Sequence, residues 1–189
     1  MNVVIVHGCP GNEEKEKTPE TRTYNKHWLY WLKEKLIDKG IACETPLMPE
    51  PWNPKYEDWK NIFDGLNIGK ETVLVGHSCG CAFLVRWLGD TRKKIKKLIL
   101  VAPWKIRSDE FTKGENELYD FEIFPAIKDN VKKVLIFTSD DEDEDGKKSA
   151  KIFEESLKGK LIEMKNKGHF VFGDMGTNEF PDLLEEILK

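Results

Sequence analysis

The segment Gly76-His77-Ser78-Cys79-Gly80 places one hydroxyl group between two glycines. The apolar stretch Thr72–Val75 precedes it, and an apolar segment with helical periodicity follows it. A serine in the pattern G-x-S-x-G, at a turn from a strand into a helix, is typical of an activated nucleophile. Glycines on both sides avoid collisions with the neighbouring backbone. We therefore expect Ser78 to act as a nucleophile, and the alternative is a tight turn with an inert serine.

A serine hydroxyl becomes a good nucleophile only when an imidazole takes its proton. On a parallel sheet with this turn, an acid and then a histidine follow the serine along the chain. Of the four histidines, only His169 lies after Ser78. We expect His77 to point away from the nucleophile, His27 to lie on a helix, and His7 to belong to a separate motif.

The acid that orients the imidazole should follow the fifth apolar stretch, Val134–Phe137. There the chain reads Thr138-Ser139-Asp140-Asp141, so both aspartates are candidates. Because parallel strands bring their carboxyl ends to one edge of the sheet, the serine, the histidine and an aspartate should meet there. Together these residues predict a Ser-His-Asp hydrolase that uses no cofactor and no metal.

Two backbone amides are candidates for the oxyanion hole. Cys79 follows the nucleophile and begins a helix, whose free amides and dipole favour negative charge. Cys9 lies in His7-Gly8-Cys9, after the first expected strand, where its amide can face Ser78 from the other side. For Cys9 the alternative is an ordinary glycine turn.

Apolar stretches of strand length alternate with segments of helical periodicity. The expected strands are Asn2–Val6, Ile41–Thr45, Thr72–Val75, Lys97–Val101, Val134–Phe137 and Lys160–Met164. The expected helices are Tyr24–Lys39, Lys55–Leu66, one beginning at Cys79, Lys147–Leu157 and Phe180–Leu188. This alternation predicts an α/β fold, with a mostly parallel sheet of about six strands and helices on both faces. We expect His7–Thr23 to be a loop, and Pro103–Asn130 to hold a short helix or a lid over the site.

Length and composition narrow the remaining choices. A chain of 189 residues suits a single domain over 1–189, and a net charge of -4 gives no basic surface for nucleic acid. No stretch approaches the roughly 18 apolar residues of a membrane span, and the start MNVVIVHG lacks the features of a signal peptide. We therefore expect a cytoplasmic protein without a membrane anchor. The four cysteines, Cys9, Cys43, Cys79 and Cys81, form no C-x-x-C pair, and we expect reduced thiols.

The acidic stretch Asp140–Asp145 allows a second interpretation. Asp141-x-Asp143-x-Asp145-Gly146 fits the start of a calcium-binding loop, although the twelfth position of that loop is Ile152 rather than a glutamate. A solvated acidic loop is the favoured alternative. If the loop lies at the mouth of the site, we expect it to disfavour anionic substrates.

The chain resembles the family of small α/β-hydrolases that includes retinoblastoma-binding protein 9 and the YdeN-like proteins of bacteria. The resemblance covers nearly the whole length. It rests on His7-Gly8, Pro10-Gly11-Asn12, the tryptophans Trp28 and Trp31, Met48-Pro49-Glu50-Pro51 with Trp59, Gly76-His77-Ser78-Cys79-Gly80, Ser139-Asp140-Asp141 and Gly168-His169-Phe170. Relatives tend to have an apolar residue and a proline soon after the aspartate, where this chain continues with further acidic residues.

The resemblance implies a compact three-layer α/β-hydrolase fold with little or no cap. It also implies a serine hydrolase acting on carboxylic esters, often with short acyl chains, through an acyl-enzyme. Ser78 would be the nucleophile, His169 the base and Asp141 the orienting acid, with Asp140 as the second choice. The expected partner is a small ester. The alternative function is that of a protein-binding or scaffolding member of the fold with weak or no catalysis.

Overall fold

The computed structural model describes residues 1–11, 13–18, 22 and 27–189. Within these ranges a six-stranded sheet has the order β2-β1-β3-β4-β5-β6, and every neighbouring pair is parallel. The strands are β1 (Asn2–Val6), β2 (Ala42–Glu44), β3 (Thr72–His77), β4 (Ile95–Val101), β5 (Val131–Ser139) and β6 (Lys160–Met164). The predicted α/β architecture is therefore confirmed.

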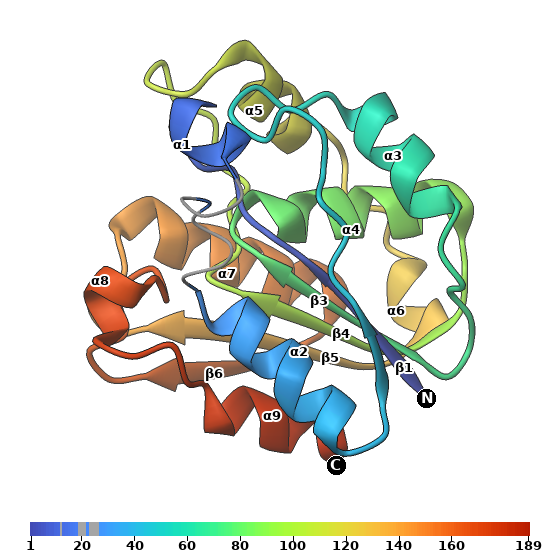
Figure 1. Ribbon diagram of the computed structural model, residues 1–189. Helices are drawn as coiled ribbons and strands as arrows, with labels where there is room; N and C mark the ends of the chain where they lie inside the picture. The colour runs from blue at the N-terminus through green and yellow to red at the C-terminus, as the bar shows by residue number, and fades with distance from the viewer. Residues whose placement is uncertain (12, 19–21, 23–26) are drawn as a thin grey trace.

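Helices cover both faces of the sheet (Figure 1). One face packs against α2 (Trp28–Asp38) and α9 (Pro181–Leu188). The other packs against α3 (Tyr56–Asp64), α4 (Cys79–Thr91), α5 (Lys113–Tyr119), α6 (Ile127–Asn130) and α7 (Glu144–Leu157). The short helices α1 (Glu13–Lys17) and α8 (Phe172–Met175) lie in loops. None of the helices described is long and apolar enough to cross a bilayer.

Strand β1 illustrates why the sheet is buried on both sides. Val3 and Ile5 belong to the core beneath α2 and α9, whereas Val4 and Val6 belong to the core beneath α4. Successive side chains of a strand point to opposite faces, so a strand between two layers of helices must be apolar throughout. Each such buried side chain stabilises the fold by about 1.5–3 kcal/mol.

Two expected segments differ from the structure. The expected loop His7–Thr23 contains helix α1, whose sequence Glu-Glu-Lys-Glu-Lys carries no apolar periodicity that would have indicated a helix. In the expected helix Tyr24–Lys39, the described part of the helix begins at Trp28. Positions 12, 19–21 and 23–26 lie outside the described residues, and they include Asn12 of the family motif.

The parallel arrangement brings the carboxyl ends of the strands to one edge of the sheet. His77 ends β3, Ser139 ends β5 and Met164 ends β6. The residues singled out for chemistry follow directly after these strand ends, so the topology alone gathers them at that edge.

Candidate active site

Ser78 lies in a strained turn between β3 and α4. Its backbone has φ 52° and ψ −124°, a region that residues other than glycine rarely adopt. The turn is held from two sides, because the Ser78 amide donates to the Val101 carbonyl at 3.0 Å and the Cys81 amide donates to the Ser78 carbonyl at 3.0 Å. The surrounding structure therefore fixes the hydroxyl at the edge of the sheet.

The two glycines of the motif are required by close backbone contacts. A Cβ atom on Gly76 would lie 2.9 Å from the Cα atom of Cys81. A Cβ atom on Gly80 would lie 2.5 Å from the His7 carbonyl oxygen. Both distances are shorter than van der Waals contact, and both neighbours are backbone atoms. Any larger residue at either position would push β1 or α4 away from the turn.

His169 lies within hydrogen-bond distance of Ser78, at 2.9 Å from its Nε2 to the serine Oγ. On the other side of the ring, Nδ1 lies 3.0 Å from Oε2 of Glu142. A carboxylate accepts, so Nδ1 carries the hydrogen and Nε2 is left to accept from the serine hydroxyl. Serine, imidazole and carboxylate thus form one continuous chain of hydrogen bonds.

The orienting carboxylate is Glu142, so the expectation that Asp141 or Asp140 contacts the imidazole is wrong. The Glu142 side chain is only 1% exposed, and its second oxygen accepts from the Asp143 amide at 3.0 Å. Gly146, one helical turn further on, makes room for it, because a Cβ atom there would lie 2.7 Å from Cγ of Glu142. An acid of either type is compatible with this position in the chain. The sequence feature that marks Glu142 is the glycine four positions later, in the first turn of the helix that follows.

Asp140 and Asp141 bind the backbone of the loop that carries the base. Asp140 accepts from the Asn166 amide at 2.8 Å, and Asp141 accepts from the Gly168 amide at 2.8 Å and from the Ser139 hydroxyl. These hydrogen bonds to Ser139 and Gly168 lower the pKa of Asp141, so it is ionised near neutral pH. The two aspartates shape the loop instead of touching the imidazole.

Two further groups complete the support of the base. The His169 amide donates to Asp174 at 2.8 Å, and its carbonyl accepts from Nε2 of His77 at 2.9 Å. Burial lowers the pKa of His77 well below its usual value, so this ring is neutral and Nε2 carries its hydrogen. His77 thus faces the backbone of His169 rather than the serine hydroxyl.

Among the described residues, which include the whole acidic stretch, no three acidic side chains are gathered in the way that a calcium-binding loop requires. Asp145 and Gly146 lie in the first turn of α7, so the pattern that suggested calcium is partly helical. The carboxylates of Asp140, Asp141 and Glu142 are instead engaged by the loop amides and the imidazole.

Cys9 and Cys79 form a disulfide, so the expectation of reduced thiols is wrong for this pair. Their Cα atoms lie 5.8 Å apart although 70 positions separate them in the chain. The fold places the loop after β1 beside the start of α4, and no local spacing announces that contact. Cys43 and Cys81 are buried free thiols.

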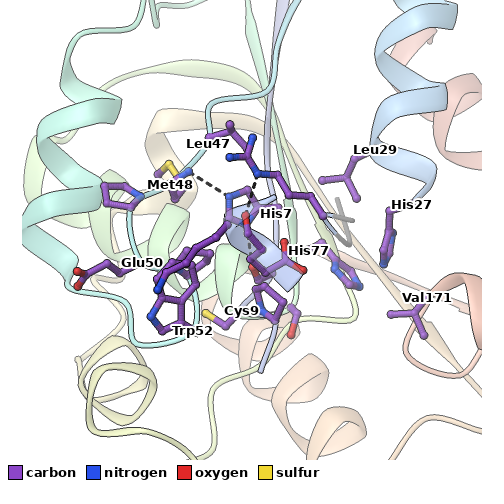
Figure 2. Close-up of a pocket in the computed structure, with 18 of the residues that line it drawn as sticks. His7, Cys9, His27, Leu29, Leu47, Met48, Glu50, Trp52, His77 and Val171 are labelled. Atoms are coloured by element: carbon purple, nitrogen blue, oxygen red, sulfur yellow. Dashed lines mark hydrogen bonds between the residues drawn. The ribbon is translucent and has the colours of Figure 1, made fainter. Parts of the chain in front are cut away.

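A pocket of about 480 Å³ opens beside Ser78 and His169 (Figure 2). His7 helps to hold the wall of the pocket, because its Nε2 accepts from the Met48 amide at 3.1 Å. This hydrogen bond joins the His7-Gly8 motif to the motif that begins at Met48. The lining combines apolar and charged side chains: His7, Gly8, Cys9, Pro10, Glu16, Lys17, Arg22, His27, Leu29, Leu47, Met48, Pro49, Glu50, Pro51, Trp52, His77, Ser78, His169 and Val171.

The lining of the pocket bears on two expectations about the mouth of the site. Among the described residues that line the pocket, none comes from 103–130 or from 140–145. The wall that faces the nucleophile comes from α1 and from the Leu47–Trp52 segment instead. The segment 103–130 holds the helices α5 and α6, as the expectation of a short helix there foresaw, and its Trp104 packs against the His169 ring with centroids 5.8 Å apart. The acidic stretch contributes no residue to the lining of the pocket.

Comparison with known proteins identifies this arrangement. The family model described as serine hydrolase matches residues 20–187. The chain belongs to the serine hydrolase family. YdeN of Bacillus subtilis (strain 168), named as a hydrolase, is 30% identical over an alignment of 189 positions that covers 95% of this chain and 90% of YdeN. The predicted family resemblance is thereby confirmed.

Solved structures of serine hydrolases and related proteins share the fold. The crystal structure of the B. subtilis ydeN gene product superimposes with a TM-score of 0.84 and 23% identity, covering 99% of this chain and 96% of that one. Est1E of Butyrivibrio proteoclasticus, solved with ferulic acid bound, gives a TM-score of 0.63 and 16% identity, with 99% and 86% covered. These likenesses establish the α/β architecture.

Proposed function

We propose that this serine hydrolase cleaves carboxylic esters through an acyl-enzyme on Ser78. The observation that carries the proposal is the hydrogen-bonded chain from the Ser78 hydroxyl through His169 to Glu142, at the floor of a pocket large enough for a small ester. Because Oε2 of Glu142 lies 3.0 Å from Nδ1 of His169, this side chain is placed to stabilise the protonated imidazole that forms during the reaction.

In the first half of the reaction, Oγ of Ser78 attacks the acyl carbon while Nε2 of His169 takes the hydroxyl proton. The carbonyl oxygen becomes negative and is stabilised by the backbone amides of Cys9 and Cys79. The tetrahedral intermediate then collapses, the C–O bond to the alcohol breaks, and His169 returns its proton to the departing alcohol. Water repeats the sequence on the acyl-serine and releases the acid.

The volume and lining of the pocket support the proposal that the substrate is an ester with a short or compact acyl group. Its apolar lining residues Leu47, Met48 and Trp52 favour burial of an apolar acyl group, whereas Lys17 and Glu50 put charges of both signs around it. The ferulic acid named for Est1E is a compact aromatic acid, and a group of that size is compatible with this volume.

Labelling with a fluorophosphonate probe tests the proposal directly. The wild-type protein should react at Ser78 and hydrolyse p-nitrophenyl acetate, whereas Ser78→Ala should do neither while it keeps its melting temperature. A panel of p-nitrophenyl esters from acetate to decanoate then measures the preference for acyl length. Wild-type protein that stays unlabelled and inactive would contradict the proposal and would favour a binding role for the fold.

A further inference from the structure

We propose that the Cys9–Cys79 disulfide positions the two backbone amides of the oxyanion hole, so that turnover requires the disulfide to be oxidised. This inference rests on the proposed function and concerns the regulation of the same site. It assigns Cys9 and Cys79 a positioning role through their covalent bond.

The disulfide joins the two segments that flank the nucleophile. Cys79 is the first residue of α4 and directly follows Ser78, and its amide has no acceptor within the helix. The loop with Cys9 passes against the nucleophile, since a Cβ atom on Gly8 would lie 3.1 Å from Cβ of Ser78. A covalent bond therefore sets the spacing of the two residues whose amides would bind the oxyanion.

The two ends of the disulfide differ in rigidity. Cys79 is fully buried at the start of a long helix whose next turn is packed in the core. The Gly8–Gly11 stretch belongs to no helix or strand, so Cys9 depends much more on the bond for its position. Breaking the bond should leave the Cys79 amide in place and release the Cys9 amide.

The disulfide is also accessible to a reductant from the pocket. Cys9 is partly exposed and lines the pocket, where its sulfur lies among the side chains drawn in Figure 2. The two free thiols behave differently, because burial raises the pKa of Cys43 to about 12 and raises that of Cys81 further. They stay protonated and unreactive near neutral pH.

Reduction by a dithiol follows ordinary thiol–disulfide exchange. A thiolate of the dithiol attacks the Cys9 sulfur, the S–S bond breaks, and Cys79 leaves as a thiolate that takes up a proton. The second thiol of the reductant then attacks the mixed disulfide and releases the Cys9 thiol. Two electrons pass from the dithiol, which becomes a cyclic disulfide, to the protein, which gains two thiols.

The experiment compares kcat and KM for p-nitrophenyl acetate before and after treatment with dithiothreitol. Thiol titration in denaturant should count two thiols in the untreated protein and four in the reduced protein. We expect kcat to fall about tenfold to a hundredfold, less than the full loss of an oxyanion donor, with little change in KM. Reoxidation should restore kcat.

Two variants serve as references. The Cys9→Ser/Cys79→Ser double variant should match the reduced wild type and should not respond to dithiothreitol. Cys43→Ser, which removes a buried thiol in β2, should respond like the wild type. Near-ultraviolet circular dichroism of the reduced wild type should keep the native signal at the assay temperature.

Several outcomes would overturn the inference. Four free thiols in the untreated protein, full kcat after complete reduction, or loss of the native dichroism signal on reduction would each do so. The fluorophosphonate probe separates this failure from failure of the proposed function. Equal labelling rates in the oxidised and reduced protein contradict only the redox dependence, whereas no labelling in either state contradicts the hydrolase proposal and the inference with it.

Discussion

Glu142 and Asp141 are neighbours in the chain, yet their carboxylates face different groups. Glu142 points inward to the imidazole, and Asp141 points to the amides of Lys167 and Gly168 at 3.1 and 2.8 Å. A carboxylate beside Nδ1 fixes the tautomer and stabilises the imidazolium. A carboxylate on backbone amides fixes the shape of the loop. At the scale of single residues, adjacent acids therefore have separate roles.

Exchanging each acid for its amide tests this division. Glu142→Gln should lower kcat by about 10²- to 10⁴-fold, because it removes the charge that stabilises the imidazolium. Asp141→Asn should keep kcat within about tenfold, because the amide oxygen can still accept from the Gly168 amide. Steady-state kinetics on p-nitrophenyl acetate measure both. The opposite order of effects would return the role of the orienting acid to Asp141.

At the scale of elements, the start of α7 controls where the orienting carboxylate lies. Gly146 sits in the helix one turn after Glu142, and the glutamate side chain occupies the space that a Cβ atom would need. Glycine costs about 0.5–1 kcal/mol relative to alanine inside a helix. Gly146 therefore lowers the stability of the helix but leaves the space that the Glu142 carboxylate occupies.

Gly146→Ala should separate stability from activity. The alanine favours the helix, but its methyl group would lie 2.8 Å from the carboxyl carbon of Glu142, so the carboxylate must move away from His169. We expect kcat to fall at least tenfold, while the melting temperature changes by only a few degrees. Gly173→Ala in α8, where a Cβ atom meets nothing within 4 Å, is the matched control and should leave kcat unchanged. Unchanged activity in Gly146→Ala would show that the side chain of Glu142 adapts without loss.

The pairing of Ser78 with His169 can be predicted from the sequence because the signals of both residues are local. The nucleophile lies in a five-residue pattern, and His169 was the one histidine after it. The carboxylate that contacts the imidazole cannot be predicted in this way, because the choice between Asp140, Asp141 and Glu142 depends on how the turn after β5 meets the His169 loop. The disulfide is equally hidden in the sequence, because a contact between residues 70 positions apart has no local spacing.

At the scale of the whole molecule, the fold buries the imidazole rings of His27 and His77 beside the site. Burial lowers the pKa of His27 from 6.5 to about 4, and it lowers that of His77 as well. The two rings lie against each other, with centroids 4.8 Å apart, so charging either one also disfavours the other. The folded protein therefore holds both rings neutral where the unfolded chain would protonate them.

This burial predicts a loss of stability in mild acid. Below pH 6.5 the unfolded chain binds a proton at His27, whereas the folded protein binds it only near pH 4. The contribution of His27 to the free energy of unfolding is therefore fully present above pH 6.5 and is lost as the pH falls to about 4. The contribution of His27 is at most roughly 3 kcal/mol. Urea denaturation from pH 8 to pH 4 measures it.

His27→Asn provides the comparison for this titration. The variant cannot be protonated at that position, so its stability should decline less between pH 6.5 and pH 4. Lys189 and Lys133 lower the pKa of Glu186 from 4.5 to about 2. The contribution of Glu186 to the free energy of unfolding is therefore lost only below pH 4.5, which separates it from that of His27. Identical pH profiles for wild type and variant would contradict the assignment to His27.

The parallel sheet also determines where the two chain ends lie, and with them how the protein can be fused or immobilised. Both chain ends lie at the edge opposite the pocket (Figure 1), where Lys97 near the start of β4 donates to the Ile187 carbonyl at 3.1 Å. A fusion partner, an affinity tag or a solid support joined to either end would leave the pocket mouth facing outward.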